Sequence, residues 1–332
     1  MEPPYLLFLG DAADDAVAKT ATGVAHWRPD SCVGEFALDG CGATTGLPRM
    51  TPTEAVAAGA KTLVVGVANA GGVIHPSWTR ALHDALRAGL DLASGLHTHL
   101  ASIPELRDEA SRLGRTLHEV RVPPSDLDVG RGAPRPGRRL LTVGTDCSVG
   151  KMFTALAIER ELRERGVRAD FRATGQTGIF IAGEGIPIDA VVADFISGAA
   201  ERLAPANDPD HWDVIEGQGS LFHPAYAGVS LGLLHGSQAE ALVMCHEPTR
   251  TEMRGAPGRG LPSVPECIEA NERAARLTEP RARVVAVAIN TRALPASEAE
   301  TCIATLARTT GLPCVDPLRH GVGPIVDGLL TR

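Results

Sequence analysis

The chain has 332 residues, is 44% hydrophobic and carries a formal net charge of −8, with acidic and basic residues mixed along it. This length favours two packed domains. The charge distribution disfavours nucleic acid or an anionic membrane as a partner, and no apolar run reaches the roughly 18 residues of a membrane span. The first residues do not resemble a signal peptide. We therefore expect a soluble, cytoplasmic homo-oligomer that acts on a small molecule.

The first part of the chain alternates short apolar strands with helices, which predicts a Rossmann-like domain over residues 1–122. Strands are predicted over 5–10, 62–67 and 117–120, and helices over 14–22, 78–88 and 103–113. The following segment, 123–138, is rich in Pro, Gly and Arg and lacks apolar periodicity, so we interpret it as a linker.

The same alternation resumes after the linker and predicts a second domain over residues 139–332. Strands are predicted over 139–143, 169–173, 212–215, 241–245 and 284–289, and helices over 151–165, 188–204, 263–276 and 296–310. The expected fold class is therefore α/β, with a P-loop NTPase-like second domain built on a mostly parallel sheet.

A phosphate-binding loop is the clearest motif, because a glycine-rich run lies between a strand pattern and a helix pattern. It contains Lys151, one of only three lysines in the chain. Backbone N–H groups, the helix dipole and the ammonium of Lys151 would converge on one anion. We assign cofactor phosphates to the run Gly144, Thr145, Asp146, Cys147, Ser148, Val149, Gly150, Lys151 and Met152.

The end of this loop differs from the usual G-x-x-x-x-G-K-[ST] pattern. Met152 replaces the hydroxyl residue that binds Mg²⁺, and a thioether is a poor ligand for that ion. Thr154 would lie about 200° round the helix from the required position. The sequence thus favours phosphate binding over magnesium-assisted hydrolysis. Cys147, beside a lysine at a helix start, could have a lowered thiol pKa, or could simply be a small residue that fits the loop.

Other polar residues follow predicted strands, where ligands bind in open α/β sheets. Glu216 ends one strand inside a glycine-rich turn, and Gln176 lies in another small-residue turn. Asp194 is a further candidate, with a solvated helix acid as the alternative. Arg250 and Arg292 offer guanidinium groups for carboxylates or phosphates.

Neither a nicotinamide cofactor nor a metal site is predicted for the first domain. Its glycine-rich turns after residues 10 and 66 lack the full G-x-G-x-x-G pattern. His97 and His99 supply at most two ligands and have no cysteine or acidic cluster beside them.

The phosphate loop resembles the G-T-D-T-x-V-G-K-T signature of dethiobiotin synthetase, except at Cys147 and Met152, and Glu216-Gly217 resembles its strand-end E-G. The whole chain is more similar to a family of two-domain bacterial and archaeal P-loop proteins, one branch of which is D-glutamate N-acetyltransferase. The runs that carry this resemblance include 95–97, 144–152, 174–178, 188–191, 198–201, 216–220, 231–237 and 246–250.

The resemblance implies transfer of an acetyl group from acetyl-CoA, as co-substrate, to the amine of D-glutamate or a similar amino acid. Under it, Lys151 and the loop hold the phosphates of CoA, Glu216 or His223 serves as the base, and Gln176 orients the reactants. Arg250 and Arg292 would bind the substrate carboxylates. Two alternatives remain: an ATP- and Mg²⁺-dependent enzyme of the dethiobiotin synthetase type, with Asp146 and Glu216 on the metal, and a nucleotide-binding module without catalysis.

Overall fold

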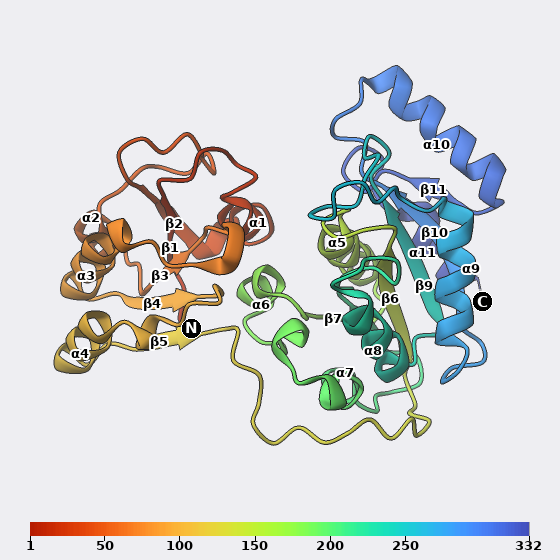
Figure 1. The fold of residues 1–332 in the computed structure, drawn as a ribbon, viewed down its shortest axis with the longest axis horizontal. Helices are drawn as coiled ribbons and strands as arrows, with labels where there is room; N and C mark the ends of the chain where they lie inside the picture. The colour runs from red at the N-terminus through yellow and green to blue at the C-terminus, as the bar shows by residue number, and fades with distance from the viewer. Residues whose placement is uncertain (332) are drawn as a thin grey trace. The chain divides into compact units, whose positions relative to one another are not determined.

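The computed structural model describes residues 1–331, apart from the side chain of Ala70. The chain forms two compact units. The first contains Met1–Pro123 together with Ile179–Pro187, and the second contains Pro124–Gly178 and the chain from Ile188 onward. Each unit has one sheet in which all strand pairs are parallel (Figure 1). The predicted α/β fold class is confirmed.

The first unit contains a five-stranded sheet in the order β2-β1-β3-β4-β5. Its strands are β1 (Tyr5–Gly10), β2 (Cys32–Ala37), β3 (Thr62–Val65), β4 (Asp91–Ser94) and β5 (Leu117–Glu119). Its α-helices are α1 (Lys19–Trp27), α2 (Pro52–Ala57), α3 (Thr79–Ala88) and α4 (Pro104–Leu113). Short 3-10 turns are η1 (Pro29–Ser31), η2 (Ala70–Gly72), η3 (Pro76–Trp78) and η4 (Leu100–Ser102).

The core of the first unit lies between the sheet and helices α2, α3 and α4. Phe8 and Leu63 of the sheet pack there with Leu82 and Leu106 of the helices, and all four are fully buried. Trp78 meets the ring of Phe8 edge-on, with centroids 5.7 Å apart.

The sequence missed two strands and the helix α2 of this unit and misplaced one other helix. β2 is an only partly buried strand that contains glycine and glutamate, so it lacks a clear apolar pattern. β4 is only four residues long. The helix predicted over 14–22 begins later, at Lys19, because Asp14 forms a local turn in which its carboxylate accepts a hydrogen bond from the N–H of Val17 at 2.9 Å.

The second unit contains a six-stranded sheet in the order β11-β10-β9-β6-β8-β7. Its strands are β6 (Arg138–Gly144), β7 (Ala169–Arg172), β8 (Trp212–Ile215), β9 (Ala241–His246), β10 (Arg283–Ile289) and β11 (Cys314–Val315). Its helices are α5 (Lys151–Glu164), α7 (Ile196–Leu203), α8 (Ala227–Ser237), α9 (Val264–Ala275), α10 (Ala296–Thr310) and α11 (Gly323–Leu330), with turns η5 (Ile188–Ala190) and η6 (Ala193–Phe195). Helix α6 (Gln176–Ala182) begins in this unit and ends in the first.

The predicted helix over 188–204 was wrong in its first half, which forms the turns η5 and η6 before α7 begins. Helices α6, α8 and α11 were not predicted. α8 has no single apolar face, so its sequence shows no clear helical periodicity. It is rich in glycine, which permits close packing against α7. A Cβ at Gly236 would lie 2.1 Å from the carbonyl oxygen of Ser197, so only glycine permits this approach.

The strand order explains where a ligand site can form. β6 lies between β9 and β8, so the segments that follow these three strands lie next to one another at the carboxyl edge of the sheet. They are the phosphate loop after β6, the turn from Glu216 after β8, and the segment from His246 after β9. Within the described residues, no helix has the length and apolar character needed to cross a membrane.

Candidate active site

The phosphate loop joins β6 to α5 through two residues with left-handed backbone. Ser148 has φ 54° and Gly150 has φ 109°. In the part of the chain that the structure describes, the N–H groups of Ser148, Val149 and Gly150 find no hydrogen-bond acceptor. Such a loop at the start of a 14-residue helix is suited to an anion.

Lys151 is folded into this loop. Its side chain is buried, and its Nζ atom donates a hydrogen bond to the carbonyl oxygen of Asp146 at 2.8 Å. A Cβ at Gly217 would lie 3.1 Å from Cδ of Lys151 and 1.6 Å from the carbonyl oxygen of Thr142, so glycine is required there. Burial lowers the pKa of Lys151. An ammonium with so little water around it interacts more strongly with a phosphate than a surface lysine does.

Asp146 and Arg250 stabilise the loop from within. The buried carboxylate of Asp146 accepts hydrogen bonds from Nη1 of Arg250 at 2.6 Å, from the N–H of Arg254 at 2.8 Å and from the N–H of Cys147 at 2.7 Å. Burial opposes ionisation of this carboxyl, but the hydrogen bonds outweigh it and lower its pKa. Arg250 also donates to the carbonyl oxygen of Cys147 at 2.6 Å. Its guanidinium therefore contacts the loop itself.

The idea that Cys147 has a lowered thiol pKa was wrong. Burial raises the pKa of Cys147, and the nearby positive charges of Lys151, Arg250 and Arg254 only partly oppose this. The thiol is therefore neutral at physiological pH and is a weak nucleophile.

Asp146, Cys147 and His223 lie close enough together to be considered as metal ligands, but the donor atoms of Asp146 and His223 are already hydrogen-bonded. Nε2 of His223 donates to the carbonyl oxygen of Arg254 at 2.9 Å, and its Nδ1 accepts from the N–H of Ala225 at 3.2 Å. With both ring nitrogens hydrogen-bonded, His223 has no free lone pair for a metal or for a proton.

Glu216 lies directly after β8 and is buried. Its Oε2 atom accepts hydrogen bonds from the N–H groups of Thr174 at 2.9 Å and Gly175 at 3.0 Å. Burial raises the pKa of Glu216 to about 7, and these hydrogen bonds and the charge of Lys151 only partly oppose it. A Cβ at Gly178 would lie 2.3 Å from Oε2, so glycine makes room for the carboxylate. A carboxyl with this pKa can accept a proton near neutral pH.

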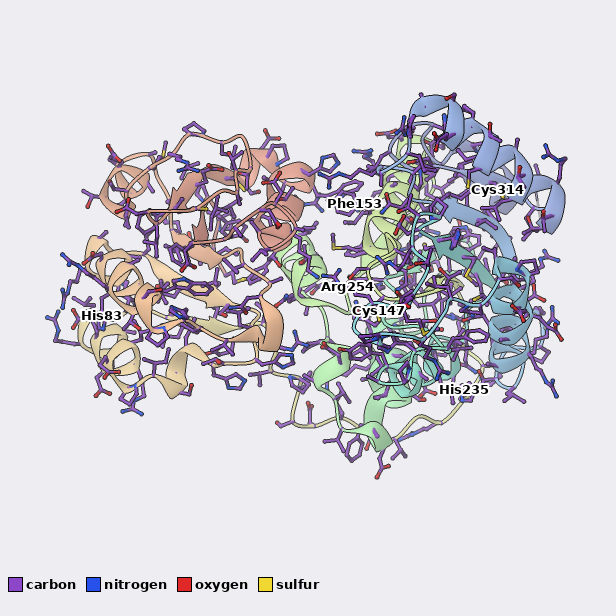
Figure 2. All side chains as sticks on the ribbon, turned by 45° about the horizontal axis from the view of Figure 1, so that its top comes forward. His83, Cys147, Phe153, His235, Arg254 and Cys314 are labelled. Carbon is purple, nitrogen blue, oxygen red and sulfur yellow. The ribbon has the colours of Figure 1, made fainter. Side chains whose placement is uncertain are left out.

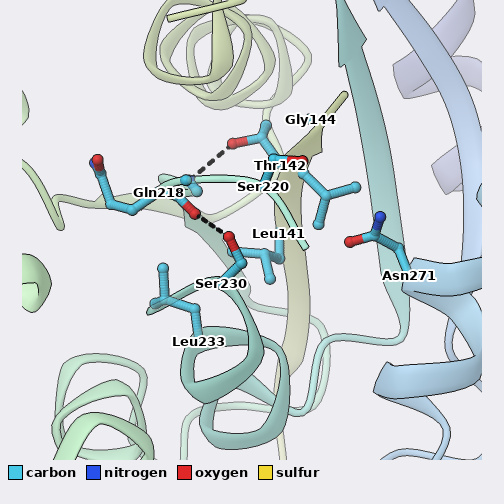
Figure 3. A pocket seen from close by; sticks show the side chains of 11 residues that line it. Leu141, Thr142, Gly144, Gln218, Ser220, Ser230, Leu233 and Asn271 are labelled. Carbon is cyan, nitrogen blue, oxygen red and sulfur yellow. Dashed lines mark hydrogen bonds between the residues drawn. The ribbon is translucent and has the colours of Figure 1, made fainter. Parts of the chain in front are cut away.

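The side-chain amide of Gln218 interacts with Glu216, and this residue was not selected from sequence. Nε2 of Gln218 donates to Oγ1 of Thr174 at 3.1 Å. The backbone carbonyl oxygen of Gln218 accepts from Oγ of Ser230 at 2.7 Å (Figure 3). The feature of the sequence that could have identified Gln218 is its position in the same glycine-rich turn as Glu216. Gln176, the predicted orienting residue, is partly buried at the start of α6.

A small cavity of about 10 Å³ lies behind this turn, with room for about one water molecule. Its walls include Thr142 and Leu141 of β6, Ser230 and Leu233 of α8, and Asn271 of α9 (Figure 3). It is too small for a substrate.

The structure brings the loop, Glu216, His223 and Arg250 together, and leaves two predicted residues apart from that network. Asp194 is exposed in η6, and among residues 1–331 no hydrogen bond or ion pair joins it to the loop. Arg292 is exposed after β10. His246, at the end of β9, was not selected from sequence, yet its Nδ1 lies 3.1 Å from Oγ1 of Thr145 in the loop. Burial lowers the pKa of His246.

Two family models match this chain, each over most of one structural unit. Residues 128–326 match the P-loop domain of the family described as a domain of unknown function, DUF1611, and residues 30–123 match its Rossmann-like N-terminal domain. The chain belongs to this family. The Rossmann-like and P-loop domains predicted from sequence are thereby confirmed.

Two relatives and one solved structure are similar over their full lengths. A protein of Tritonibacter scottomollicae is 53% identical over 99% of both chains, and one of Pseudoalteromonas sp. is 49% identical over 99% of both; each is named D-glutamate N-acetyltransferase. The crystal structure of a DUF1611 family protein from Anabaena variabilis superposes with a TM-score of 0.89 at 34% identity, covering 100% of both chains.

Proposed function

We propose that this chain is an amino-acid N-acetyltransferase that moves an acetyl group from acetyl-CoA to the amine of D-glutamate. The observation that carries the proposal is the pair of relatives with this name, each about half identical to the chain over nearly all of both proteins. An acetyltransferase needs an acyl donor, and the chemistry of the phosphate loop supports coenzyme A in that role.

The loop suits a phosphate compound that is bound without being hydrolysed. Coenzyme A carries a pyrophosphate, which the free N–H groups of the loop and the ammonium of Lys151 can hold. Met152 provides no hydroxyl for Mg²⁺. Thr154 carries the next hydroxyl along α5. This side chain is buried, and its Oγ1 lies 3.6 Å from Sγ of Cys245.

The ATP- and Mg²⁺-dependent alternative has weaker support for the same reason. It needs the carboxylates of Asp146 and Glu216 as metal ligands. Asp146 already accepts three hydrogen bonds, one of them from the guanidinium of Arg250, and Glu216 accepts two from backbone N–H groups. A cation would have to displace these donors.

Glu216 is the base in this proposal. D-glutamate binds as an ammonium, which must lose a proton before its nitrogen can attack a thioester carbonyl carbon. The nitrogen–carbon bond then forms as the carbon–sulfur bond breaks, and the further proton that the nitrogen loses passes to the departing thiolate, which leaves as the thiol of CoA. With a pKa of about 7, Glu216 can take the proton from the ammonium. His223 is less suitable because both of its ring nitrogens are hydrogen-bonded.

Positioning should contribute more to the rate than proton transfer. Holding two reactants in line can supply about 7–11 kcal/mol, whereas a general base gives about 10²–10⁴-fold. Gln218 and Thr174 fix the turn around Glu216. Arg292, exposed after β10, is the proposed partner for a substrate carboxylate, because the guanidinium of Arg250 is used by the loop.

The test is a mass-spectrometric assay of D- and L-amino acids with acetyl-CoA, run with and without Mg²⁺. We expect N-acetyl-D-glutamate to form at the same rate in both conditions. Magnesium-dependent release of ADP from ATP, with no acetylated product, would favour the dethiobiotin synthetase type of reaction. Tight nucleotide binding without any product would favour a binding module.

A further inference from the structure

A short hairpin-like loop between β9 and α9 presents an arginine beside the phosphate loop. The hairpin comprises residues 251–260. Two backbone hydrogen bonds close it. The N–H of Met253 donates to the carbonyl oxygen of Arg259 at 2.8 Å, and the N–H of Arg259 donates to the carbonyl oxygen of Ala256 at 3.1 Å. The side chain of Met253 is buried and anchors it. The hairpin is therefore an ordered element that can hold a side chain in place.

The backbone of Arg254, within this hairpin, is fixed on both sides by residues of the site. Its N–H donates to Oδ2 of Asp146 at 2.8 Å, and its carbonyl oxygen accepts from Nε2 of His223 at 2.9 Å. Asp146 belongs to the phosphate loop itself. The position from which the Arg254 side chain extends is therefore set relative to that loop.

The guanidinium of Arg254 remains available for a ligand. Arg254 is exposed, and within the described residues its side chain makes no ion pair or hydrogen bond. Its charge acts on the thiol of Cys147, and Figure 2 labels the two residues next to each other. Arg250 differs, since its guanidinium is used by Asp146 and Cys147.

We propose that Arg254 binds the 3′-phosphate of coenzyme A and so selects this donor over ligands that lack it. The inference rests on the proposed function, in which Lys151 and the loop hold the pyrophosphate. The 3′-phosphate is attached to the ribose that carries this pyrophosphate, so it lies just outside the loop. The unpaired guanidinium of Arg254, held beside the loop, is suited to bind this additional phosphate dianion. ATP carries no phosphate at this position.

The test compares the binding of CoA and 3′-dephospho-CoA by calorimetry, which requires no turnover. We expect the natural protein to bind CoA about 10- to 100-fold more tightly than dephospho-CoA, the range for a charge-assisted contact. Arg254→Gln should weaken CoA binding to the level of dephospho-CoA and leave dephospho-CoA binding unchanged. The matched control is Arg283→Gln, which removes an exposed arginine at the amino end of β10, and it should keep the preference.

Two results would overturn the assignment of Arg254 while leaving the proposed function intact. One is equal affinity of the natural protein for both ligands. The other is an Arg254→Gln variant that weakens both ligands equally, because that would indicate a role in holding the hairpin or in general attraction. Failure of the natural protein to bind either ligand would instead contradict the loop as a CoA site, and the assignment with it.

Discussion

Replacement of Glu216 by glutamine tests the proposed base most selectively. The side chain keeps its size and an oxygen that can accept the hydrogen bonds from Thr174 and Gly175, but it can no longer take a proton. Because a general base contributes about 10²–10⁴-fold, we expect kcat to fall by that factor. With a pKa of about 7, kcat/KM of the natural protein should fall about tenfold per pH unit below neutrality, and the variant should lose this dependence.

The same substitution has a calculable effect on stability. Raising the pKa of Glu216 from 4.5 to about 7 corresponds to about 3 kcal/mol. Because the fold favours the protonated carboxyl, this stabilisation is present below pH 4.5 and is lost as the pH rises through 7. Glutamine does not ionise. The variant should therefore gain about 3 kcal/mol in unfolding free energy relative to the natural protein between pH 4.5 and 7.5.

The two measurements are independent. Denaturant unfolding at several pH values gives the stability difference, and initial rates of acetylated product give the pH profile. A variant that keeps the acidic limb of the profile, or loses less than tenfold in kcat, would show that another group accepts the proton. A pH-independent stability difference would show that the Glu216 carboxyl is not destabilised by burial.

Three further predictions concern the phosphate loop and the turn after β8. Lys151→Ala should weaken CoA binding by about 1.5–3 kcal/mol in calorimetry, since a charge-assisted contact is lost, and unchanged affinity would refute its role. Removal of Mg²⁺ with a chelator should leave the rate of acetyl transfer unchanged, and a large loss would indicate that a metal ion takes part in the reaction. Gly217→Ala should destabilise the fold by about 1–3 kcal/mol or more, because its Cβ would lie 1.6 Å from the carbonyl oxygen of Thr142. In its control, Gly228→Ala in α8, a Cβ would meet nothing within 4 Å, so denaturant unfolding should show no loss of stability.

The sequence predicted those elements whose apolar run or helical periodicity begins and ends at a clear boundary. β8 and α10 were predicted with the bounds that the structure shows, and β1 likewise. α8 was missed because it is apolar on more than one side and carries glycines for contact with α7. β11 has only two residues, too few for any pattern.

The candidate site was only partly predictable for a related reason. Lys151 and Glu216 follow strands within recognisable motifs, so their places were accessible from sequence. The use of Arg250 by the carboxylate of Asp146, 104 residues away in the chain, depends on strand order. So does the contact of Arg254 with the same carboxylate. Burial, which sets the pKa values of Cys147 and Glu216, is likewise a property of the folded chain.

A crystal structure of the protein with CoA and D-glutamate tests the central claim most directly. The account predicts pyrophosphate oxygens within hydrogen-bond distance of the N–H groups of Val149 and Gly150 and of Nζ of Lys151, with the amine of D-glutamate near the carboxylate of Glu216. A pyrophosphate bound elsewhere on the protein, with this loop making no contact to it, would contradict the account.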